Sequence, residues 1–301
     1  MKPATTAFPL LVIPGMARSG TTYLYHALGD HPEIVTPVRK ETNFFGPRYG
    51  RGPTWFASLF EETPRLRWAA DISPTYFNDA DCIDRIHIWN GPVRLVMGVR
   101  DPVDYAVSLY EHLEAIGQSV PDFEDFLQGF VQESHGGSFP HHFHPGALMG
   151  RVEEFLAAFG TEILIYDYAA LSRSPLEVLE RIEAFLELSP WFESSRVRTR
   201  PINARGSRIL PNPIRRVGRE STYDTVMGLV PTRLLRRVRR LVDYVDAAVT
   251  RPRIADPSKA SLAHHHLRED QERYRAMFRS SSFVVGNDTG ATRTTKEECT
   301  A

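Results

Sequence analysis

The stretch GMARSGTT, residues 15–22, decides the fold of this 301-residue chain. It follows the apolar run FPLLVI and precedes YLYHAL, and its two threonines open the helical pattern TTYLYHAL, so it indicates a glycine-containing turn between a buried strand and a helix. Such a turn aims backbone N–H groups at one point, and the helix dipole adds positive charge there. The stretch therefore predicts a loop that binds an anion.

The loop departs from the pattern of nucleoside triphosphatases, G-x-x-x-x-G-K-[ST], in which the lysine reaches the phosphates and the hydroxyl residue holds magnesium. Gly15 and Gly20 have the required spacing, but Thr21 stands in place of the lysine and Arg18 brings a cation inside the loop. With neither the lysine nor an acidic partner for magnesium, the sequence favours a phosphate-bearing ligand that binds without metal.

Further strand and helix patterns follow the loop. VRLVMGVRDP, with a predicted strand at 93–99, leads into the helical pattern VDYAVSLYEHLEA, and TEILIYDYAAL leads into another helix that ends near residue 188. Between them, GRGPTWFASLF predicts a helix and LRWAADIS a strand. Alternating strands and helices predict a single α/β domain with a central parallel sheet and helices on both faces. We assign residues 1–280 to this domain and 281–301 to a flexible C-terminal tail.

Composition excludes some classes of protein. The net charge of −1 gives no argument for nucleic acid as a partner. Cys82 and Cys299 lie far apart and form no disulfide framework, which favours a reducing compartment. The apolar runs are too short to span a bilayer, and the N-terminus lacks a secretory pattern. We expect a soluble cytoplasmic protein that binds no nucleic acid and holds no metal; its oligomeric state is left open.

A second cation follows the strand 93–99. Arg100 ends this strand, and Ser108 lies two helical turns further along the chain, so the two side chains can hold a second phosphate beside the first. In the alternative interpretation, Arg100 pairs with Asp101 or Asp104 and Ser108 is a neutral residue on the helix surface.

Three stretches in this order, residues 15–45, DISPTYF at 71–77 and VRLVMGVRDPVDYAVSLY at 93–110, resemble sulfotransferases that use 3′-phosphoadenosine 5′-phosphosulfate (PAPS). The motifs in these stretches are most similar to those of the bacterial members and of the glycosaminoglycan O- and N-sulfotransferases. The resemblance implies a phosphate-loop-like α/β fold, PAPS as co-substrate, and transfer of the sulfuryl group to a hydroxyl.

The resemblance also implies roles for single residues. Arg18 takes the place of a lysine that is usual in the family; its fixed charge can stabilise the leaving group, but a guanidinium is a poor proton donor. The implied donor-binding residues are Arg18, Ser19, Gly20, Thr21 and Thr22 at the 5′-phosphosulfate, Arg100 and Ser108 at the 3′-phosphate, Tyr23 and Tyr166 at the adenine, and Arg205 and Gly206 in a later element.

The catalytic base is implied by RKETNFF, residues 39–45. Glu41 takes the position of the general base, and Lys40 polarises it or contacts the sulfuryl group. Two alternatives remain: a solvated Lys–Glu pair in front of an aromatic anchor, or a histidine base, as in the cytosolic steroid and phenol sulfotransferases. The candidate histidines are His112, His141, His142 and His144.

The acceptor is suggested by one departure from the family. Heparan-type enzymes have a lysine in EKTPAYF, where this chain has Ile72. Loss of that cation argues against a highly sulfated polysaccharide and favours a small alcohol, a phenol or a glycoside. The candidate pocket walls are Phe44, Phe45, Trp55, Tyr76 and Phe77.

Other segments leave alternatives open. Residues 231–249 form a basic amphipathic pattern that either packs on the protein's own core or makes peripheral contact with an anionic membrane. Residues 136–150 form a loop rich in glycine, proline and histidine, of a length that suits a lid or a substrate loop. Two rival functions remain: a small-molecule kinase of the phosphate-loop class, and a non-catalytic protein that binds nucleotide or associates with a membrane.

Overall fold

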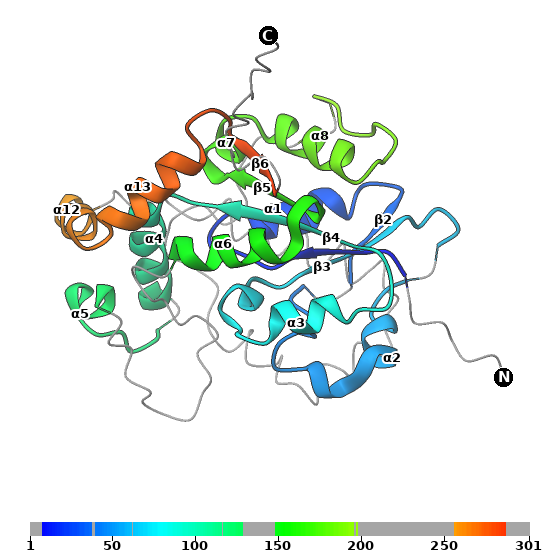
Figure 1. Ribbon diagram of the computed structural model, residues 1–301, viewed down its shortest axis with the longest axis horizontal. Coiled ribbons are helices and arrows are strands. Elements are labelled where there is room, and N and C mark those ends of the chain that lie inside the picture. The colour runs from blue at the N-terminus through cyan, green and yellow to red at the C-terminus, as the bar shows by residue number, and fades with distance from the viewer. Residues whose placement is uncertain are drawn as a thin grey trace, which may run out of the picture.

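The computed structural model describes residues 8–37, 40–61, 63–115, 117–128, 148–195, 197 and 256–286. Its centre is a six-stranded sheet with the order β2-β3-β1-β4-β5-β6 (Figure 1). The strands are β1 (Leu10–Ile13), β2 (Ile34–Val35), β3 (Trp68–Ile72), β4 (Val93–Val99), β5 (Ile163–Asp167) and β6 (Phe283–Val285). The first five are parallel, whereas β6 is antiparallel to β5. The predicted α/β class with a central parallel sheet is confirmed.

The sheet is buried on both faces, which explains why β1 is apolar at every position. Leu10 and Val12 belong to one core layer, and Leu11 and Ile13 belong to the other. All four side chains are fully buried. Because side chains alternate between the faces of a strand, a run without polar residues requires cover on both sides.

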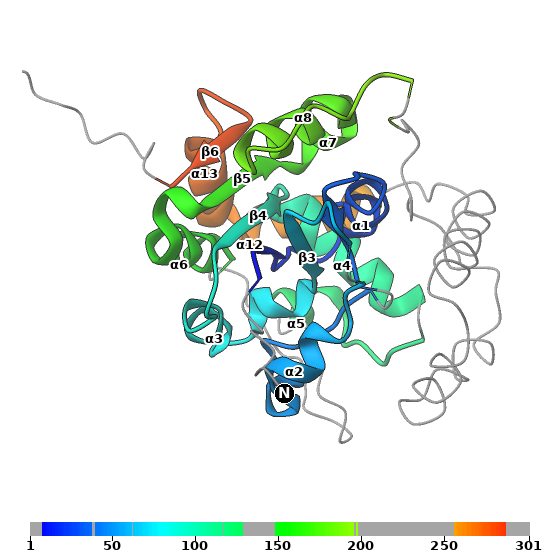
Figure 2. The same cartoon turned by 90° about the vertical axis from the view of Figure 1, so that its right-hand side faces the viewer.

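Helices provide that cover, as predicted. In Figure 2, α7 and α8 lie on one side of the sheet, and α2, α3 and α6 lie on the other. The 3-10 helices are η1 (Tyr49–Arg51), η2 (Pro74–Asn78) and η3 (Gly160–Glu162). The α-helices up to residue 185 are α1 (Thr21–Leu28), α2 (Gly52–Ala57), α3 (Cys82–His87), α4 (Pro102–Ala115), α5 (Phe123–Leu127), α6 (Leu148–Phe159), α7 (Tyr168–Arg173) and α8 (Pro175–Phe185).

The C-terminal helices α12 (Pro257–His266) and α13 (Arg268–Met277) return the chain to the sheet. The Gln271 side-chain amide donates to both oxygens of the Asp101 carboxylate just after β4, and the shorter of the two N–O distances is 3.0 Å. The Tyr274 hydroxyl donates to Asp167 at the end of β5 over 2.7 Å. Helix α13 therefore fixes the carboxyl ends of two neighbouring strands.

Strand β6 lies in a part of the chain that the sequence assigned to the tail. Its central residue, Val284, is 9% exposed and pairs with Ile165 of β5. Residues 283–285 thus extend the sheet instead of starting a tail, and residues 287–301 are outside the described residues.

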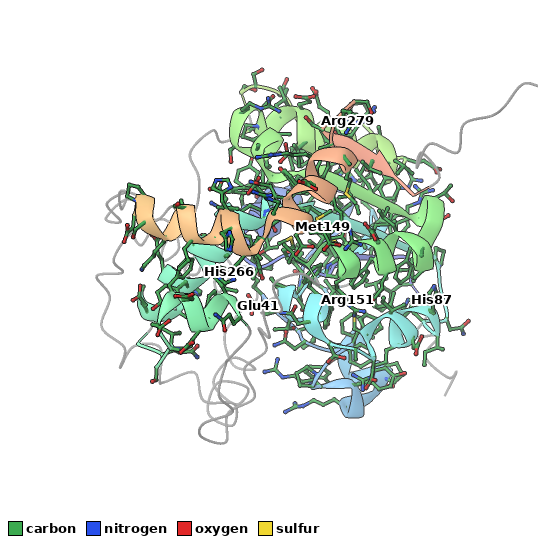
Figure 3. All side chains as sticks on the ribbon, turned by 60° about the vertical axis from the view of Figure 1, so that its left-hand side comes forward. Glu41, His87, Met149, Arg151, His266 and Arg279 are labelled. Atoms are coloured by element: carbon green, nitrogen blue, oxygen red, sulfur yellow. The ribbon has the colours of Figure 1, made fainter. Side chains whose placement is uncertain are left out.

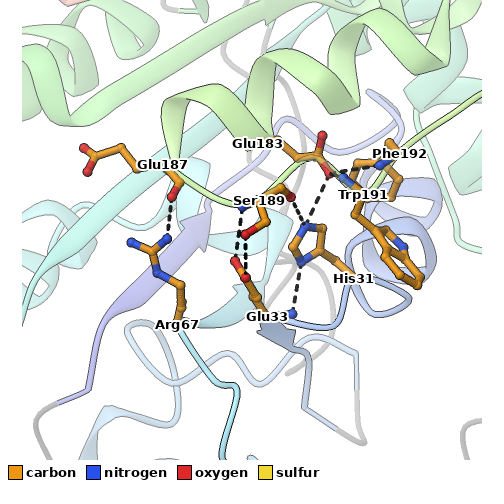
Figure 4. Close-up of polar contacts among 8 residues, drawn as sticks. All are labelled: His31, Glu33, Arg67, Glu183, Glu187, Ser189, Trp191 and Phe192. Atoms are coloured by element: carbon orange, nitrogen blue, oxygen red, sulfur yellow. Dashed lines mark hydrogen bonds and ion pairs between the residues drawn. The ribbon is translucent and has the colours of Figure 1, made fainter.

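A buried histidine joins the edge of the sheet to the segment that follows α8 (Figure 4). His31 Nδ1 accepts the Glu33 N–H over 3.1 Å, so its proton is on Nε2. That nitrogen lies 3.3 Å from Glu183 Oε1, and the same oxygen accepts the N–H groups of Trp191 and Phe192. The Glu183 carboxylate therefore holds the chain after α8 against the turn that enters β2.

Several sequence predictions fall outside the described residues: Arg205, Gly206, the basic pattern at 231–249, and most of the loop at 136–150. The last residues of that loop, Leu148 to Gly150, form the first turn of α6. Among the helices of the described segments, not one has both the length and the apolar character needed to cross a membrane.

Candidate functional site

The loop between β1 and α1 lies at the carboxyl end of the central strand. The Met16 N–H donates to the Gly98 carbonyl on β4 over 3.1 Å, and the Phe77 N–H donates to the Pro14 carbonyl over 2.9 Å. From β1 the chain crosses to the β3 side of the sheet, whereas from β4 it crosses to the β5 side. A ligand crevice is expected where the connections that follow two neighbouring parallel strands run in opposite directions along the sheet.

The loop has a fixed backbone. Gly20 has a φ of 87°, a conformation that is strained for residues with a side chain, and a Cβ there would also displace the end of the Leu171 side chain. Arg18 has a φ of 65°, which is uncommon for a residue with a side chain. Ser19 is fully buried, and its hydroxyl donates to the Met16 carbonyl. The path of the loop thus depends on left-handed backbone at Arg18 and Gly20 and on the buried bond of Ser19.

Helix α1 adds to the positive potential of the loop. It begins at Thr21 without a side-chain cap and without an acidic residue in its first turn. The first N–H groups of a helix have no acceptor within the helix, so they can bind an anion. Tyr23, in the first turn of α1, is 7% exposed, and its hydroxyl has no hydrogen-bond partner among the described residues. Burial raises the pKa of Tyr23 to about 12.

The two predicted cations meet at the loop. Arg18 Nε lies 3.4 Å from Ser108 Oγ, and Arg100 Nη1 donates to the Arg18 carbonyl over 3.2 Å. The Arg100 guanidinium lies over the Tyr168 ring, 4.9 Å from its centroid. Asp101, the alternative partner of Arg100, accepts hydrogen bonds from the first turn of α4 and from α13. The structure therefore brings together the loop, the strand-end arginine and the helix hydroxyl.

The two tyrosines near the end of β5 differ in position. Tyr166 is fully buried, and its hydroxyl donates to the Ser19 carbonyl over 3.0 Å. A Cβ on Gly98 would lie 2.5 Å from that hydroxyl, so Tyr166 supports the loop from beneath. Tyr168 lies under the Arg100 guanidinium and near Gly20. Sequence reasoning missed Tyr168, although it follows Tyr166 in the quoted stretch IYDYAAL.

The Lys40–Glu41 pair forms a second group near the carboxyl end of β3. Lys40 Nζ lies 2.8 Å from Glu41 Oε1; the lysine side chain is 6% exposed and the glutamate side chain 43% exposed (Figure 3). The Asn43 N–H donates to the Ser73 hydroxyl, and the Ser73 N–H donates to the Ile13 carbonyl of β1. A chain of contacts thus links the Glu41 segment to the strand that carries the loop.

A buried carboxylate lies behind this segment. Asp71, near the end of β3, is fully buried and accepts hydrogen bonds from the hydroxyls of Tyr76, Thr42 and Ser73. Burial is the largest cause that raises the pKa of Asp71, which reaches about 6; the Glu41 charge raises it further, and the three hydroxyl bonds lower it. Sequence reasoning used the motif DISPTYF for the family resemblance, for Ile72 and for the aromatic residues Tyr76 and Phe77, and it missed Asp71.

The shifted pKa of Asp71 gives a pH prediction. Because the folded pKa lies above the ordinary value of 3.8, the contribution of Asp71 to stability is complete below about pH 4 and is lost as the pH rises through about 6. The shift corresponds to about 3 kcal/mol of unfolding free energy. We expect the ¹³C resonance of the Asp71 carboxyl to titrate near pH 6. The internal control is Asp256, whose pKa is lowered by its hydrogen bonds to Ser258. A midpoint near 4 for Asp71 contradicts the prediction.

The residues proposed as walls of an acceptor pocket are mostly core. Phe44, Phe45, Tyr76 and Phe77 are at most 2% exposed and belong to one core cluster, whereas Trp55 is half-buried beside it. Ile72 is fully buried in the opposite core layer, which also contains the apolar residues of α1.

The alternative histidines lie on α4 or outside the described residues. His112 is half-buried in the last turn of α4. His141, His142 and His144 are outside the described residues. Within the segments that the structure describes, no cluster of histidine, cysteine, aspartate and glutamate could hold a metal ion.

Curated proteins of known activity resemble part of this chain. The chain is 31% identical over 121 residues to heparan sulfate glucosamine 3-O-sulfotransferase 6 of Homo sapiens, covering 40% of this chain and 35% of the relative. It is 30% identical over 105 residues to the membrane-associated sulfotransferase kil1 of Dictyostelium discoideum, covering 34% and 22%. The matched region thus spans about a third or less of each curated relative.

A solved structure and a family model also match this chain. The crystal structure of a sulfotransferase from Alicyclobacillus acidocaldarius has a TM-score of 0.51 and 23% sequence identity, and the match covers 63% of this chain and 88% of that protein, which supports the α/β fold. Residues 9–198 match the family model of the sulfotransferase domain, and this segment contains the loop, Glu41, Asp71, Arg100 and Ser108. The chain therefore belongs to the sulfotransferase family.

Proposed function

We propose that this protein transfers the sulfuryl group of PAPS to a hydroxyl of a small molecule or a glycoside. The observation that carries the proposal is the contact of both arginines at the loop: Arg18 Nε reaches Ser108, and Arg100 donates to the Arg18 carbonyl. The loop arginine and the strand-end arginine therefore place two positive charges beside a helix N-terminus. This arrangement suits a ligand with two separate anionic groups.

The donor would bind with its two anionic ends on different elements. The loop and the first turn of α1, residues 18–22, would hold the 5′-phosphosulfate, and Arg100 with Ser108 would hold the 3′-phosphate. The unpartnered Tyr23 hydroxyl and the half-buried Tyr168 are candidates for contact with the nucleoside. The full burial of Tyr166 supports a role beneath the loop in place of the adenine contact that the family resemblance implies. Arg205 and Gly206 stay candidate donor-binding residues.

The transfer would proceed in line. Glu41 accepts the proton of the acceptor hydroxyl, the acceptor oxygen forms a bond to sulfur, and the bond between sulfur and the 5′-phosphate oxygen breaks. The products are a sulfate ester and 3′-phosphoadenosine 5′-phosphate (PAP). The half-exposed Glu41 carboxylate can reach an acceptor, and Lys40 at 2.8 Å holds one of its oxygens. Arg18 would stabilise the charge that develops on the leaving phosphate.

The class of acceptor is inferred from the name of one relative and from an uncharged residue, Ile72, in a position where heparan-type members carry a lysine. The human relative is named for heparan sulfate glucosamine, which supports a sugar hydroxyl as one option. Ile72, buried where heparan-type members carry lysine, supports an acceptor with less negative charge. We therefore favour an uncharged glycoside, phenol or alcohol. A cytoplasmic location and peripheral membrane contact through residues 231–249 stay predictions.

Nucleotide binding tests the donor assignment. We expect PAP at 100 times its Kd, in buffer with EDTA, to stabilise the protein by about 2.7 kcal/mol. For a chain of 301 residues this corresponds to a rise in Tm of about 4–5 °C. Differential scanning fluorimetry checks the shift, with adenosine 5′-phosphate as the matched ligand without the 3′-phosphate.

The same experiment separates the rival functions. Stabilisation by ATP with magnesium, and none by PAP, contradicts the proposal and supports the kinase. Stabilisation by PAP without sulfation of any acceptor supports the non-catalytic nucleotide-binding protein.

A further inference from the structure

The buried carboxylate of Asp71 has no role in the transfer step described above. It accepts hydrogen bonds from Tyr76 over 2.6 Å, Thr42 over 2.8 Å and Ser73 over 2.9 Å. A carboxylate is costly to bury, and hydrogen bonds from hydroxyls offset only part of that cost. Such a group calls for an explanation beyond packing, because a neutral side chain would fill the same space.

Each of the three hydroxyls also accepts a backbone N–H from the segment that follows Glu41. The bonds run from the N–H groups of Asn43, Phe44 and Phe45 to the hydroxyl oxygens of Ser73 at 3.1 Å, Thr42 at 3.2 Å and Tyr76 at 3.1 Å, respectively. A backbone N–H can only donate, and a hydroxyl has one proton. The proton of each hydroxyl is therefore available to Asp71, and the carboxylate fixes the direction of all three.

This network fixes a segment with an unusual backbone. Glu41 and Asn43 have φ values of 67° and 53°, in the left-handed region that is unfavourable for residues with side chains. On the other side, Arg48 Nη1 donates to the carbonyls of Glu41 over 3.4 Å and Thr42 over 2.9 Å. The strained conformation is thus held from both sides, next to the residue assigned as the base.

We propose that Asp71 is a positioning residue for Glu41: through the hydroxyls of Thr42, Ser73 and Tyr76 it holds residues 43–45 and so sets the direction of the Glu41 carboxylate. The inference rests on the proposed function, because it assumes that Glu41 takes the acceptor proton. Small errors in the position of a catalytic group reduce the rate without changing the affinity for a donor that is held elsewhere.

The direct variant, Asp71→Asn, can fail to fold, because its amide N–H groups would face three hydroxyl donors. The test therefore uses Thr42, which is fully buried and next to Glu41. Thr42→Val keeps the shape of the side chain and removes the hydroxyl, whereas Thr42→Ser keeps the hydroxyl. Thermal denaturation of both variants checks that each is folded.

Turnover is followed as PAP release from PAPS, with water, 2-naphthol and octyl glucoside as acceptor probes. We expect Thr42→Val to lower kcat by about 10–100-fold while the KM for PAPS changes by less than about threefold. Thr42→Ser should restore kcat to within about threefold of wild type. In a Glu41→Gln background, Thr42→Val should have little further effect, because the base it positions is absent.

The outcomes separate this inference from the proposed function. If Thr42→Val lowers turnover equally with and without Glu41, or raises the KM for PAPS as much as it lowers kcat, the network supports the fold in general and the inference is wrong. Full activity of Thr42→Val also overturns it, while the proposed function stands. If wild type releases no PAP with any probe, the proposed function fails and the inference fails with it.

Discussion

Replacement of Glu41 by glutamine is expected to lower kcat by about 10²–10⁴-fold, which is the usual contribution of a positioned general base. Glutamine keeps the size of the side chain but cannot accept the proton from the acceptor hydroxyl. The Glu41 side chain is 43% exposed, and the substitution leaves the bond of Arg18 to Ser108 and the bond of Arg100 to the Arg18 carbonyl in place, so donor binding should be nearly unchanged. Steady-state kinetics and the Kd of PAP from calorimetry check both parts.

The control for this variant is Glu180→Gln, which changes the same chemical group at an exposed position on α8. It should leave both kcat and the Kd of PAP at wild-type values. Unchanged turnover of Glu41→Gln removes Glu41 from the mechanism and returns attention to a histidine base. A large loss of PAP affinity in the same variant shows instead that Glu41 helps to shape the donor site.

Replacement of Arg100 by alanine is expected to weaken PAP binding by about 10–100-fold, because hydrogen bonds to charged groups contribute about 1.5–3 kcal/mol. Adenosine 5′-phosphate lacks the 3′-phosphate, so its affinity should change by less than about threefold. Arg100→Lys keeps the charge without the planar fork and should fall between wild type and alanine. Calorimetric titrations of the two nucleotides check the prediction.

The comparison of the two nucleotides is needed because Arg100 also supports the loop. Its guanidinium donates to the Arg18 carbonyl and stacks on Tyr168, so alanine removes a structural contact as well as a charge. If both nucleotides lose affinity equally, Arg100 acts by holding the loop. Its assignment to the 3′-phosphate is then wrong.

The parts of the site that local sequence determines could be predicted. The loop, α1, β4 and the spacing of Arg100 and Ser108 depend on short-range patterns: an apolar run, a glycine-containing turn and a 3.6-residue period. Since a strand end and the helix after it are fixed together, the contact of Ser108 with Arg18 follows once β4 lies beside β1.

The parts that depend on contacts between distant segments could not be predicted. Asp71 lies 29 residues from Thr42 in sequence, and only the fold brings the two together. Strand β6 is three apolar residues near the C-terminus, and it becomes a strand because the edge of β5 is available to pair with it. The contacts of α13 with Asp101 and Asp167 likewise join residues more than 100 positions apart.

Transfer of labelled sulfur tests the central claim most directly. The protein is incubated in EDTA with [³⁵S]PAPS and a panel of phenols, alkyl glycosides and amino-sugar oligosaccharides, and labelled product and PAP are both quantified. The proposed function predicts that one acceptor forms a labelled sulfate ester in equal amount to PAP, and that Glu41→Gln abolishes most of this product. Absence of both ester and PAP from the wild-type reaction, together with phosphate transfer from ATP in magnesium, would contradict it.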